Sequence, residues 1–329
     1  MRVLVTGGSG FIGSHVVDKL RARGIEVCIF DMVMPTFRND VEFYHGRLLD
    51  LEALRMALNA VDAVYHLAAV ADVKDVYNDP YYAESINVRG TIHVLEAVRR
   101  STGVKRVIYG STTWVYSEAT EPVVDERTPL RAPNHLYTAT KIASEYYCQS
   151  YSKLYDIPVT ILRYGIPYGP RARDGAVVPI FVRKALKGEP LTIAGDGSQF
   201  RKFVYVEDLA EGNVLALKPV AKNKIYNLDG AELVTIKQIA EAIQRHIGNV
   251  RIEYVPGRPG DFSGKEISSR LAKDELGWEP VVRFEEGLRR YIEWYRAQAA
   301  RGEEAMALVD ETLKTDFLSG AAAARGGVK

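Results

Sequence analysis

The chain has 329 residues, of which 47% are hydrophobic and 26% are charged, and its formal net charge is +1. This length suits one large domain or two closely joined ones, and the composition is ordinary for a globular protein. The near-zero charge provides no electrostatic bias toward nucleic acid or an anionic membrane surface, so neither is expected as a partner.

The two cysteines, Cys28 and Cys148, have no CxxC pattern and no neighbouring cysteine–histidine pair. This disfavours both a disulfide framework and a zinc site, and we expect two buried thiols, no metal and a reducing, cytoplasmic location. The sequence opens directly on a strand pattern instead of a secretory signal. Because no stretch of about 18 apolar residues occurs, no membrane span is expected.

Strand-like and helix-like segments alternate through the first half of the chain. The pattern predicts strands at 3–5, 27–30, 62–68, 104–110 and 157–163, and helices near 11–23, near 81–100 and around 137–141. Because the strands are almost continuously apolar, this βαβα order predicts an α/β fold with a doubly wound parallel sheet, covered by helices on both faces.

The composition changes after residue 165, where glycine and proline are more frequent and the predicted strands are shorter. We expect residues 1–165 to form the first domain and residues 166–298 a smaller α/β substrate domain. The segment 203–228 has the pattern of a strand, a helix and a second strand at 225–228, and it is expected to return to the first domain. The tail, 299–329, contains one plausible amphipathic helix at about 303–318.

A glycine-rich turn follows the first predicted strand. In "VLVTGGSGFIGSHVV", Gly7, Gly10 and Gly13 open a helix, which would place backbone N–H groups and the helix dipole where a pyrophosphate can sit. The second strand ends at Asp31, and a carboxylate there can bind a ribose diol but would repel a 2′-phosphate. This favours NAD over NADP, although Asp31 could instead be a helix cap or turn residue.

The sequence "YTATK" at 137–141 places Tyr137 and Lys141 four residues apart, on one face of a helix. Taken alone, the pair is equally consistent with a solvated helix face. Free tyrosine has a pKa near 10 and is a poor base at neutral pH, but a lysine ammonium one helical turn away favours the phenolate.

A family resemblance emerges from several motifs together. "TGGSGFIG", "HLAA" at 66–69, "STTWVY" at 111–116 and "YTATK" occur in the order and spacing of the extended short-chain dehydrogenases/reductases, which have a Rossmann-type fold. The chain resembles their nucleotide-sugar branch, the UDP-glucose 4-epimerases and relatives, from Met1 to about Arg296. "GDGSQFRKFVYVEDLA", "RPGD" and "LGWEPVVRFEEGLRRYIEWY" extend this resemblance through the second half.

The resemblance implies three groups of site residues. The catalytic set is Thr112, Tyr137 and Lys141, and the last two also contact the cofactor. The other NAD-binding residues are Gly7, Gly10, Phe11, Ile12 and Gly13 in the phosphate loop, Asp31 at the ribose, Asp50 and Leu51 beside the adenine, and Leu67, Ala68 and Ala69 beside the nicotinamide. The substrate residues are Thr112, Arg201, Arg258 and Asp261, with Lys74 and Arg173 as further candidates.

The implied reaction is epimerisation at C4 of a nucleotide sugar through a transient 4-keto sugar. Tyr137 would take the hydroxyl proton, Lys141 would tune it, and Thr112 would hold the same sugar oxygen. Related dehydratases and decarboxylases carry an acid just after the threonine position, where this chain has Thr113 and Trp114, so both reactions rank below epimerisation.

A second departure concerns the sugar. Relatives read "RYFNVYGP", whereas this chain reads "RYGIPYGP", so Ile166 replaces an asparagine that binds the sugar nucleotide. The same loop offers Arg173, which could pair with the carboxylate of a uronate, and Lys74 could add charge. Both could equally be solubilising surface residues.

The expected function is therefore that of an NAD-dependent isomerase acting on a UDP-sugar of the glucose/galactose type. UDP-glucuronate 4-epimerisation, net oxidoreduction on the same fold and a non-catalytic NAD-sensing module are the alternatives. The resemblance also implies a homodimer, formed by pairing the "YTATK" helix and the preceding one into a four-helix bundle.

Overall fold

The computed structural model describes residues 1–248, 250–256 and 264–300. The expected tail helix at 303–318 lies outside these residues. The chain divides into two compact units, each built from several segments. Unit 1 comprises 1–167, 201–233 and 264–284, and unit 2 comprises the described residues of 168–200, 234–263 and 285–300.

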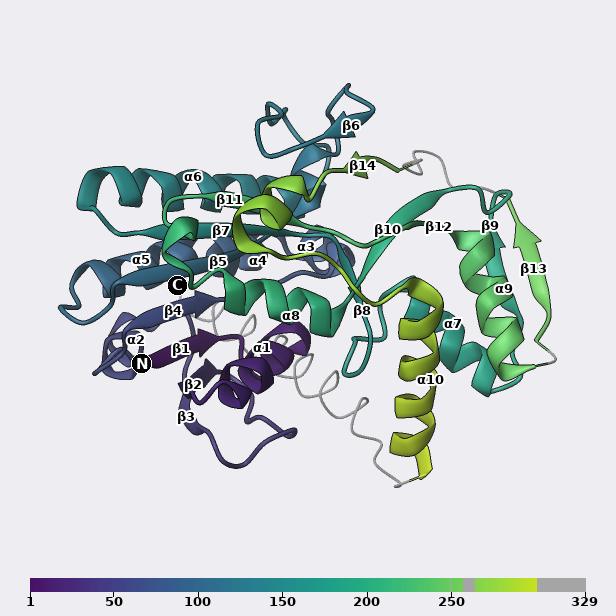
Figure 1. The fold of residues 1–329 in the computed structure, drawn as a ribbon, viewed down its shortest axis with the longest axis horizontal. Helices are drawn as coiled ribbons and strands as arrows, with labels where there is room; N and C mark the ends of the chain where they lie inside the picture. The colour runs from purple at the N-terminus through teal and green to yellow at the C-terminus, as the bar shows by residue number, and fades with distance from the viewer. Residues whose placement is uncertain (249, 257–263, 301–329) are drawn as a thin grey trace, which may run out of the picture. The chain divides into compact units, whose positions relative to one another are not determined.

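The centre of unit 1 is a seven-stranded sheet with the order β11-β7-β5-β4-β1-β2-β3 (Figure 1). Every neighbouring pair is parallel. Strand order reverses beside β1, and in such sheets ligands bind at the carboxyl ends of the strands near this point. The strands are β1 (Arg2–Thr6), β2 (Glu26–Asp31), β3 (Glu42–His45), β4 (Ala63–His66), β5 (Arg106–Thr112), β7 (Val159–Tyr164) and β11 (Ile225–Leu228).

Helices cover both faces of this sheet, so the structure confirms the predicted Rossmann-type fold. One face holds α1 (Phe11–Ala22) and α8 (Val206–Leu215), and the other holds α2 (Leu51–Ala57), α5 (Gly90–Arg99) and α6 (Leu136–Tyr155). Two short helices, α3 (Val73–Asn78) and α4 (Pro80–Glu84), precede a π-helical turn, η1 (Ser85–Arg89). The helix predicted near 81–100 is confirmed, because α4, η1 and α5 follow one another without a gap, and it contains one π-helical turn.

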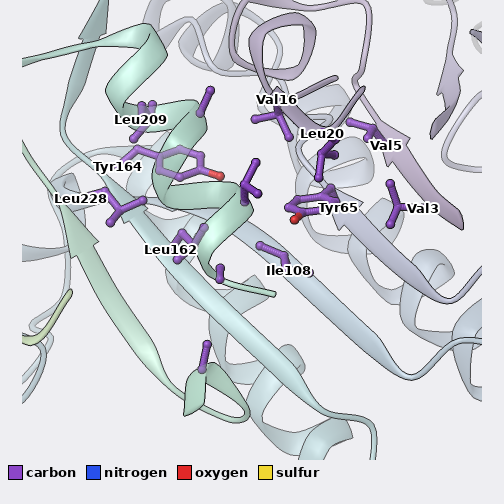
Figure 2. Close-up of a cluster of buried hydrophobic side chains, with 14 of the residues drawn as sticks. Val3, Val5, Val16, Leu20, Tyr65, Ile108, Leu162, Tyr164, Leu209 and Leu228 are labelled. Atoms are coloured by element: carbon purple, nitrogen blue, oxygen red, sulfur yellow. The ribbon is translucent and has the colours of Figure 1, made fainter. Parts of the chain in front are cut away.

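The core on the α1 and α8 face is almost entirely aliphatic and aromatic (Figure 2). Val16 and Leu20 of α1 and Leu209 of α8 pack on side chains that point from the sheet, including Val5 and Tyr164. Because parallel strands covered on both faces are apolar throughout, the sequence pattern located six of the seven strands, including β11 at the end of the returning segment. Strand β3 escaped prediction because "EFYH" is half-exposed at the sheet edge.

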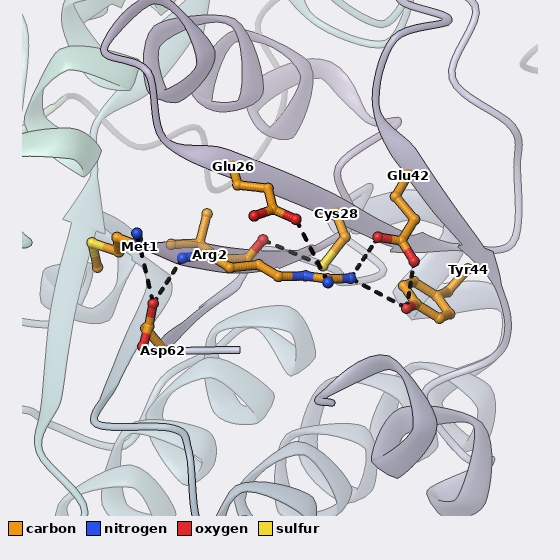
Figure 3. Close-up of polar contacts among 8 residues, drawn as sticks. Met1, Arg2, Glu26, Cys28, Glu42, Tyr44 and Asp62 are labelled. Carbon is orange, nitrogen blue, oxygen red and sulfur yellow. Dashed lines mark hydrogen bonds and ion pairs between the residues drawn. The ribbon is translucent and has the colours of Figure 1, made fainter. Parts of the chain in front are cut away.

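A polar cluster ties β1, β2 and β3 together away from the carboxyl ends (Figure 3). A guanidinium nitrogen of Arg2 lies 2.5 Å from Oε2 of Glu42, and the Tyr44 hydroxyl donates to the other carboxylate oxygen, Oε1, at 2.6 Å. The backbone N–H of Arg2 donates to Asp62, just before β4. Burial raises the pKa of the neighbouring Cys28 thiol to about 11, so this cysteine stays protonated.

The remaining elements of unit 1 are short. β6 (Val123–Val124) pairs in parallel with β14 (Glu266–Ile267). The single turns are η2 (Thr113–Tyr116), η3 (Pro219–Ala221) and η4 (Ala272–Leu276). The chain passes between the units in β8 (Ile166–Tyr168), β10 (Phe200–Tyr205) and β12 (Leu233–Thr235).

Unit 2 contains α7 (Val177–Leu186), α9 (Ile236–Ile247) and most of α10 (Phe284–Ala300), with β9 (Leu191–Ala194) parallel to β13 (Ile252–Val255). Thr235 and Gln238 form a reciprocal capping box that begins α9. In the part of the chain that the structure describes, no helix has the length and apolar character needed to cross a membrane.

Candidate active site

The glycine loop lies at the carboxyl end of β1 and leads directly into α1. Gly7 has a φ of +70°, and a Cβ there would lie 2.6 Å from the backbone nitrogen of Ala68. A Cβ on Gly13 would lie 2.1 Å from the carbonyl oxygen of Gly7. Any side chain at either position would force the loop apart, so both glycines are required by close backbone packing.

The loop fits a pyrophosphate on the evidence of its own geometry. Gly10 begins α1 without a side chain over the helix end, and the first turn, residues 11–14, contains no acidic residue. The N–H groups of this turn and the positive end of the helix dipole therefore face no carboxylate from their own helix. Phe11 and Ile12 are half-buried beside the loop, and Ile12 packs against the apolar core.

Asp31 is the last residue of β2, as predicted. One of its carboxylate oxygens accepts the N–H of Ser9 at 3.0 Å, and the other accepts the N–H of Val33 at 3.2 Å. The carboxylate is thus held against the glycine loop by two backbone donors. An acid fixed beside a phosphate loop suits the ribose diol of NAD and opposes an added phosphate.

The other predicted cofactor residues follow β4 or precede α2. Asp50 caps α2 by accepting the N–H of Ala53 at 3.0 Å, and Leu51 packs on the core. Leu67, Ala68 and Ala69 form the half-buried segment after β4. The N–H of Leu67 donates to the carbonyl of Thr6, which ties this segment to the end of β1.

Thr112, Tyr137 and Lys141 come from two adjacent elements of unit 1. Thr112 ends β5 and is 6% exposed, and its hydroxyl accepts the N–H of Trp114 at 3.2 Å, which starts η2. Tyr137 and Lys141 lie one turn apart on α6, where Tyr137 is half-buried and Lys141 is 3% exposed.

The ammonium of Lys141 anchors α6 to β5. Nζ donates to the carbonyl oxygen of Gly110 at 2.6 Å and lies 4.3 Å from the centre of the Tyr109 ring. Burial lowers the pKa of Lys141 to about 8, against the effects of Cys148 and Glu145, which raise it. The side chain is therefore largely protonated at neutral pH. The solvated-face alternative is wrong for this lysine.

Buried hydrogen bonds of His66 and Asn87 connect β1, β4, η1, α5 and α6 next to these predicted catalytic residues. His66 bridges the hydroxyls of Thr6 and Thr91, at 2.8 and 3.0 Å, and burial lowers its pKa to about 3, so it is neutral. Asn87, in the π-helical turn η1, donates to the Thr140 hydroxyl on α6 at 3.0 Å. The π-helical turn thus brings an amide against the helix of Tyr137 and Lys141.

Sequence reasoning missed a buried ion pair next to these residues. Arg163 of β7 donates to both carboxylate oxygens of Glu145, through Nη2 at 2.6 Å and through Nε at 3.0 and 3.3 Å. Glu145 follows Lys141 by four residues, so the same spacing that pairs Tyr137 with Lys141 would have indicated it. No local pattern identifies Arg163, which lies in a strand.

In the loop that departs from the relatives' pattern, Gly165 lies against a buried carboxyl group. A Cβ on Gly165 would lie 2.1 Å from a carboxylate oxygen of Asp229, which follows β11. Asp229 is 3% exposed, and burial raises its pKa to about 7. The glycine at 165 is therefore required by an unusual buried carboxyl group, which sequence reasoning did not single out.

The predicted substrate residues are dispersed over both units. Lys74 is exposed on α3, and Arg201 is half-buried on β10, both in unit 1. Arg173 is exposed in the unit 2 segment before α7. Arg258 and Asp261 lie outside the described residues. The predicted glycine loop and the predicted catalytic elements thus lie at the carboxyl ends of the strands of one sheet. The sugar-binding residues stay a prediction.

Comparison with known proteins agrees with this arrangement. A model of the NAD dependent epimerase/dehydratase family matches residues 3–229. The structure of UDP-glucose 4-epimerase from Thermus thermophilus, in complex with NAD, is 36% identical, with a TM-score of 0.82 over 90% of this chain and 99% of that one.

Two further relatives show the breadth of the family. UDP-glucuronic acid 4-epimerase from Bacillus cereus, solved with UDP-glucuronic acid and NAD, is 29% identical with a TM-score of 0.82, over 90% of this chain and 99% of that one. UDP-N-acetyl-alpha-D-glucosaminuronate decarboxylase from Bacillus cytotoxicus is 34% identical over 90% of this chain and 98% of its own length.

The family match covers well over half of the chain and includes the glycine loop, Asp31 and the helix with Tyr137 and Lys141. The chain therefore belongs to the NAD-dependent epimerase/dehydratase family of nucleotide-sugar enzymes, and NAD is its cofactor.

Proposed function

We propose that this protein is a nucleotide-sugar 4-epimerase that acts on a UDP-sugar of the glucose/galactose type. The observation that carries the proposal is the placement of Lys141, whose ammonium is buried against the carbonyl of Gly110. This contact sets the face of α6 with Tyr137 beside the strand that ends in Thr112.

NAD, when bound, supplies a hydride acceptor that can return the hydride to the same carbon. Tyr137 accepts the proton of the C4 hydroxyl and later gives it back. Thr112 holds the same oxygen through its hydroxyl, and the ammonium of Lys141 stabilises the ionised phenol. Gly7, Gly10 and Gly13 hold the pyrophosphate of NAD, and Asp31 holds its ribose.

The turn after Thr112 supports epimerisation over elimination or decarboxylation. Thr113 is buried, and Trp114 packs edge-on against His135 with ring centres 5.4 Å apart. Neither residue provides the acid/base carboxylate that those reactions need beside the sugar.

The test is a panel of nucleotide sugars incubated with the purified protein without added cofactor, with NMR analysis of the configuration at C4. Interconversion of UDP-glucose and UDP-galactose is the expected result. A product that has lost water or carbon dioxide, or a requirement for stoichiometric NAD, would reject the proposal in favour of a dehydratase, a decarboxylase or a net oxidoreductase.

UDP-glucuronate is the second candidate substrate because of Arg173. This residue is exposed in the segment before α7, and its guanidinium can bind a sugar carboxylate through two hydrogen bonds. If the substrate is a uronate, Arg173→Ala should reduce kcat/KM for the uronate by about tenfold or more and leave neutral sugars within about twofold.

The matched control for this variant is Arg270→Ala, which removes an exposed arginine of unit 1 that pairs with Asp274. Equal losses on uronate and neutral substrates in Arg173→Ala would exclude the carboxylate contact.

A further inference from the structure

The ion pair between Glu145 and Arg163 is withdrawn from water. Their side chains are 1% and 3% exposed, and three hydrogen bonds join the guanidinium to the carboxylate. Burying two charges costs more than packing apolar residues of the same size, so such a pair is weak evidence for stability. Its position relative to the catalytic elements suggests another role.

The pair connects three elements that meet at the proposed catalytic residues. Glu145 lies on α6, one turn after Lys141, and its carboxylate accepts a hydrogen bond from Ser111 at 2.5 Å. Ser111 directly precedes Thr112 on β5. The carboxylate thus joins the strand of Thr112 to the helix of Tyr137 and Lys141.

Arg163 extends the connection to the other side of Thr112. Its guanidinium donates to the hydroxyl of Tyr116 at 2.5 Å, and Tyr116 lies in the turn η2 that begins after Thr112. The Tyr116 hydroxyl donates in turn to Asn227 of β11 at 2.9 Å. Thr112 is therefore held between two residues, Ser111 and Tyr116, that bond to the same ion pair.

Glu145 also contributes to the charge of Lys141, because its carboxylate raises the pKa of the ammonium that burial lowers. The other titratable groups near this ammonium are Cys148 and Tyr137 on α6, Tyr109 on β5 and His66 on β4. Burial raises the pKa values of Cys148 and Tyr109 far above neutrality and lowers that of His66 to about 3, so all three are uncharged at neutral pH. The carboxylate of Glu145, which pairs with Arg163, remains as an acidic group that favours the protonated lysine.

We propose that Glu145 is a positioning residue for Lys141 and Thr112, and that Arg163 anchors it. The carboxylate keeps the lysine charged, and through Ser111 it sets the distance between β5 and α6. This inference rests on the proposed function in one respect: it takes Thr112, Tyr137 and Lys141 as the groups that meet the sugar and NAD.

The first experiment measures the protonation of Lys141 directly, without reference to the sugar. The full-length, NAD-loaded protein is labelled with [¹³C]lysine, and the Cε signal of Lys141, assigned with Lys141→Met, is titrated. Glu145→Gln should lower the titration midpoint by roughly half a pH unit or more, because a negative charge is lost and the Arg163 charge remains.

Arg163→Gln breaks the same ion pair but removes a positive charge instead, so the midpoint should rise or stay unchanged. Asp208→Asn is the matched control, because Asp208 is a buried carboxylate of α8 that accepts the N–H groups of Val281 and Val282 at 3.0 and 2.8 Å. This control should leave the midpoint unchanged. Equal shifts in the two pair variants, or no shift in Glu145→Gln, would overturn the assigned role.

The second experiment uses a milder change, in case the pair variants do not fold. Ser111→Ala keeps both charges and removes only the hydrogen bond from β5 to Glu145. We expect kcat to fall about tenfold or more, with NAD content unchanged and KM within about twofold, because misplacement affects the reacting geometry. Wild-type kcat in this variant would reject the connection through Ser111.

The two arms separate this inference from the proposed function. If the wild-type protein epimerises no nucleotide sugar, the proposed function fails, while the lysine titration still decides the role of Glu145. If epimerisation occurs and Glu145→Gln does not shift the titration midpoint of Lys141, the inference fails alone.

Discussion

Tyr137 differs from its partners Thr112 and Lys141 in burial, and this difference matches their proposed roles. Thr112 and Lys141 are nearly enclosed and fixed by hydrogen bonds to the backbone, whereas Tyr137 is half-buried at the start of α6. A base must reach a substrate that enters and leaves, while the residues that orient and charge it need rigid support.

The phenol of Tyr137 is the first group to test. Tyr137→Phe should reduce kcat by roughly 10²- to 10⁴-fold, the usual contribution of a general base, and leave bound NAD unchanged. Steady-state kinetics and the NAD content of the purified protein check both expectations. Tyr146→Phe, at an exposed position on the same helix, should retain wild-type kcat. If Tyr137→Phe also turned over normally, Tyr137 would not be the base.

Asp229 links stability to pH. Its folded-state pKa of about 7 lies above the unfolded value of 3.8, so between these values the folded state binds a proton that the unfolded state lacks. The stability that this protonated carboxyl contributes to the folded state is therefore fully present below pH 3.8 and is lost as the pH rises through about 7. Wild-type stability should fall across this range relative to a variant without the titrating group.

The free energy of unfolding of Asp229→Asn, relative to that of the wild type, should therefore rise by about 2–3 kcal/mol between pH 5 and pH 8. Urea unfolding at the two pH values measures this difference. Asp274→Asn, which changes an exposed aspartate in the same unit, serves as the control. A constant difference between Asp229→Asn and the wild type at both pH values would show that this carboxyl does not titrate as described.

At the scale of elements, the glycine loop joins three pieces of backbone within van der Waals contact. The end of β1, the start of α1 and the segment after β4 meet there because Gly7 and Gly13 have no side chains. The loop sequence predicted this geometry well, since few other residues tolerate such close approach. The contact of Gly7 with Ala68 came only from the structure, because the two residues are distant in sequence.

Gly13→Ala tests the loop as a unit. The added methyl group would lie 2.1 Å from the Gly7 carbonyl oxygen, so the loop must shift and the N–H groups at the start of α1 must move. NAD affinity, measured by calorimetry on the cofactor-depleted protein, should fall by about tenfold or more. Unchanged affinity would show that the loop does not bind the pyrophosphate.

The helix α6 has one side buried toward the sheet and an opposite side that is partly exposed. Thr138, Lys141, Ser144, Glu145 and Cys148 are buried toward the sheet. The opposite side forms a shallow groove of about 340 Å³ lined by Tyr146, Tyr147, Tyr151, Leu154 and Tyr155, among others. An exposed apolar surface of this kind suits association with another protein.

At the scale of the whole molecule, a homodimer stays a prediction that this face makes testable. Tyr147→Glu places a charge on the exposed side of α6 and should convert a dimer to a monomer in sedimentation velocity. Met56→Glu, at an exposed position on α2, should leave the association state unchanged. A dimer that persists in Tyr147→Glu would place the interface elsewhere.

The sequence by itself determined the elements whose signals are local. Continuous apolar strands, the GxxGxxG turn, the acid at the end of β2 and the tyrosine–lysine spacing each depend on residues close together in the chain. Only the tertiary structure decided the burial of Lys141, the pairing of Glu145 with Arg163 and the place of Asp229 beside Gly165. These depend on which side chains meet across strands and helices far apart in the chain, and at Asp229 the resulting burial raises the pKa of the carboxyl to about 7.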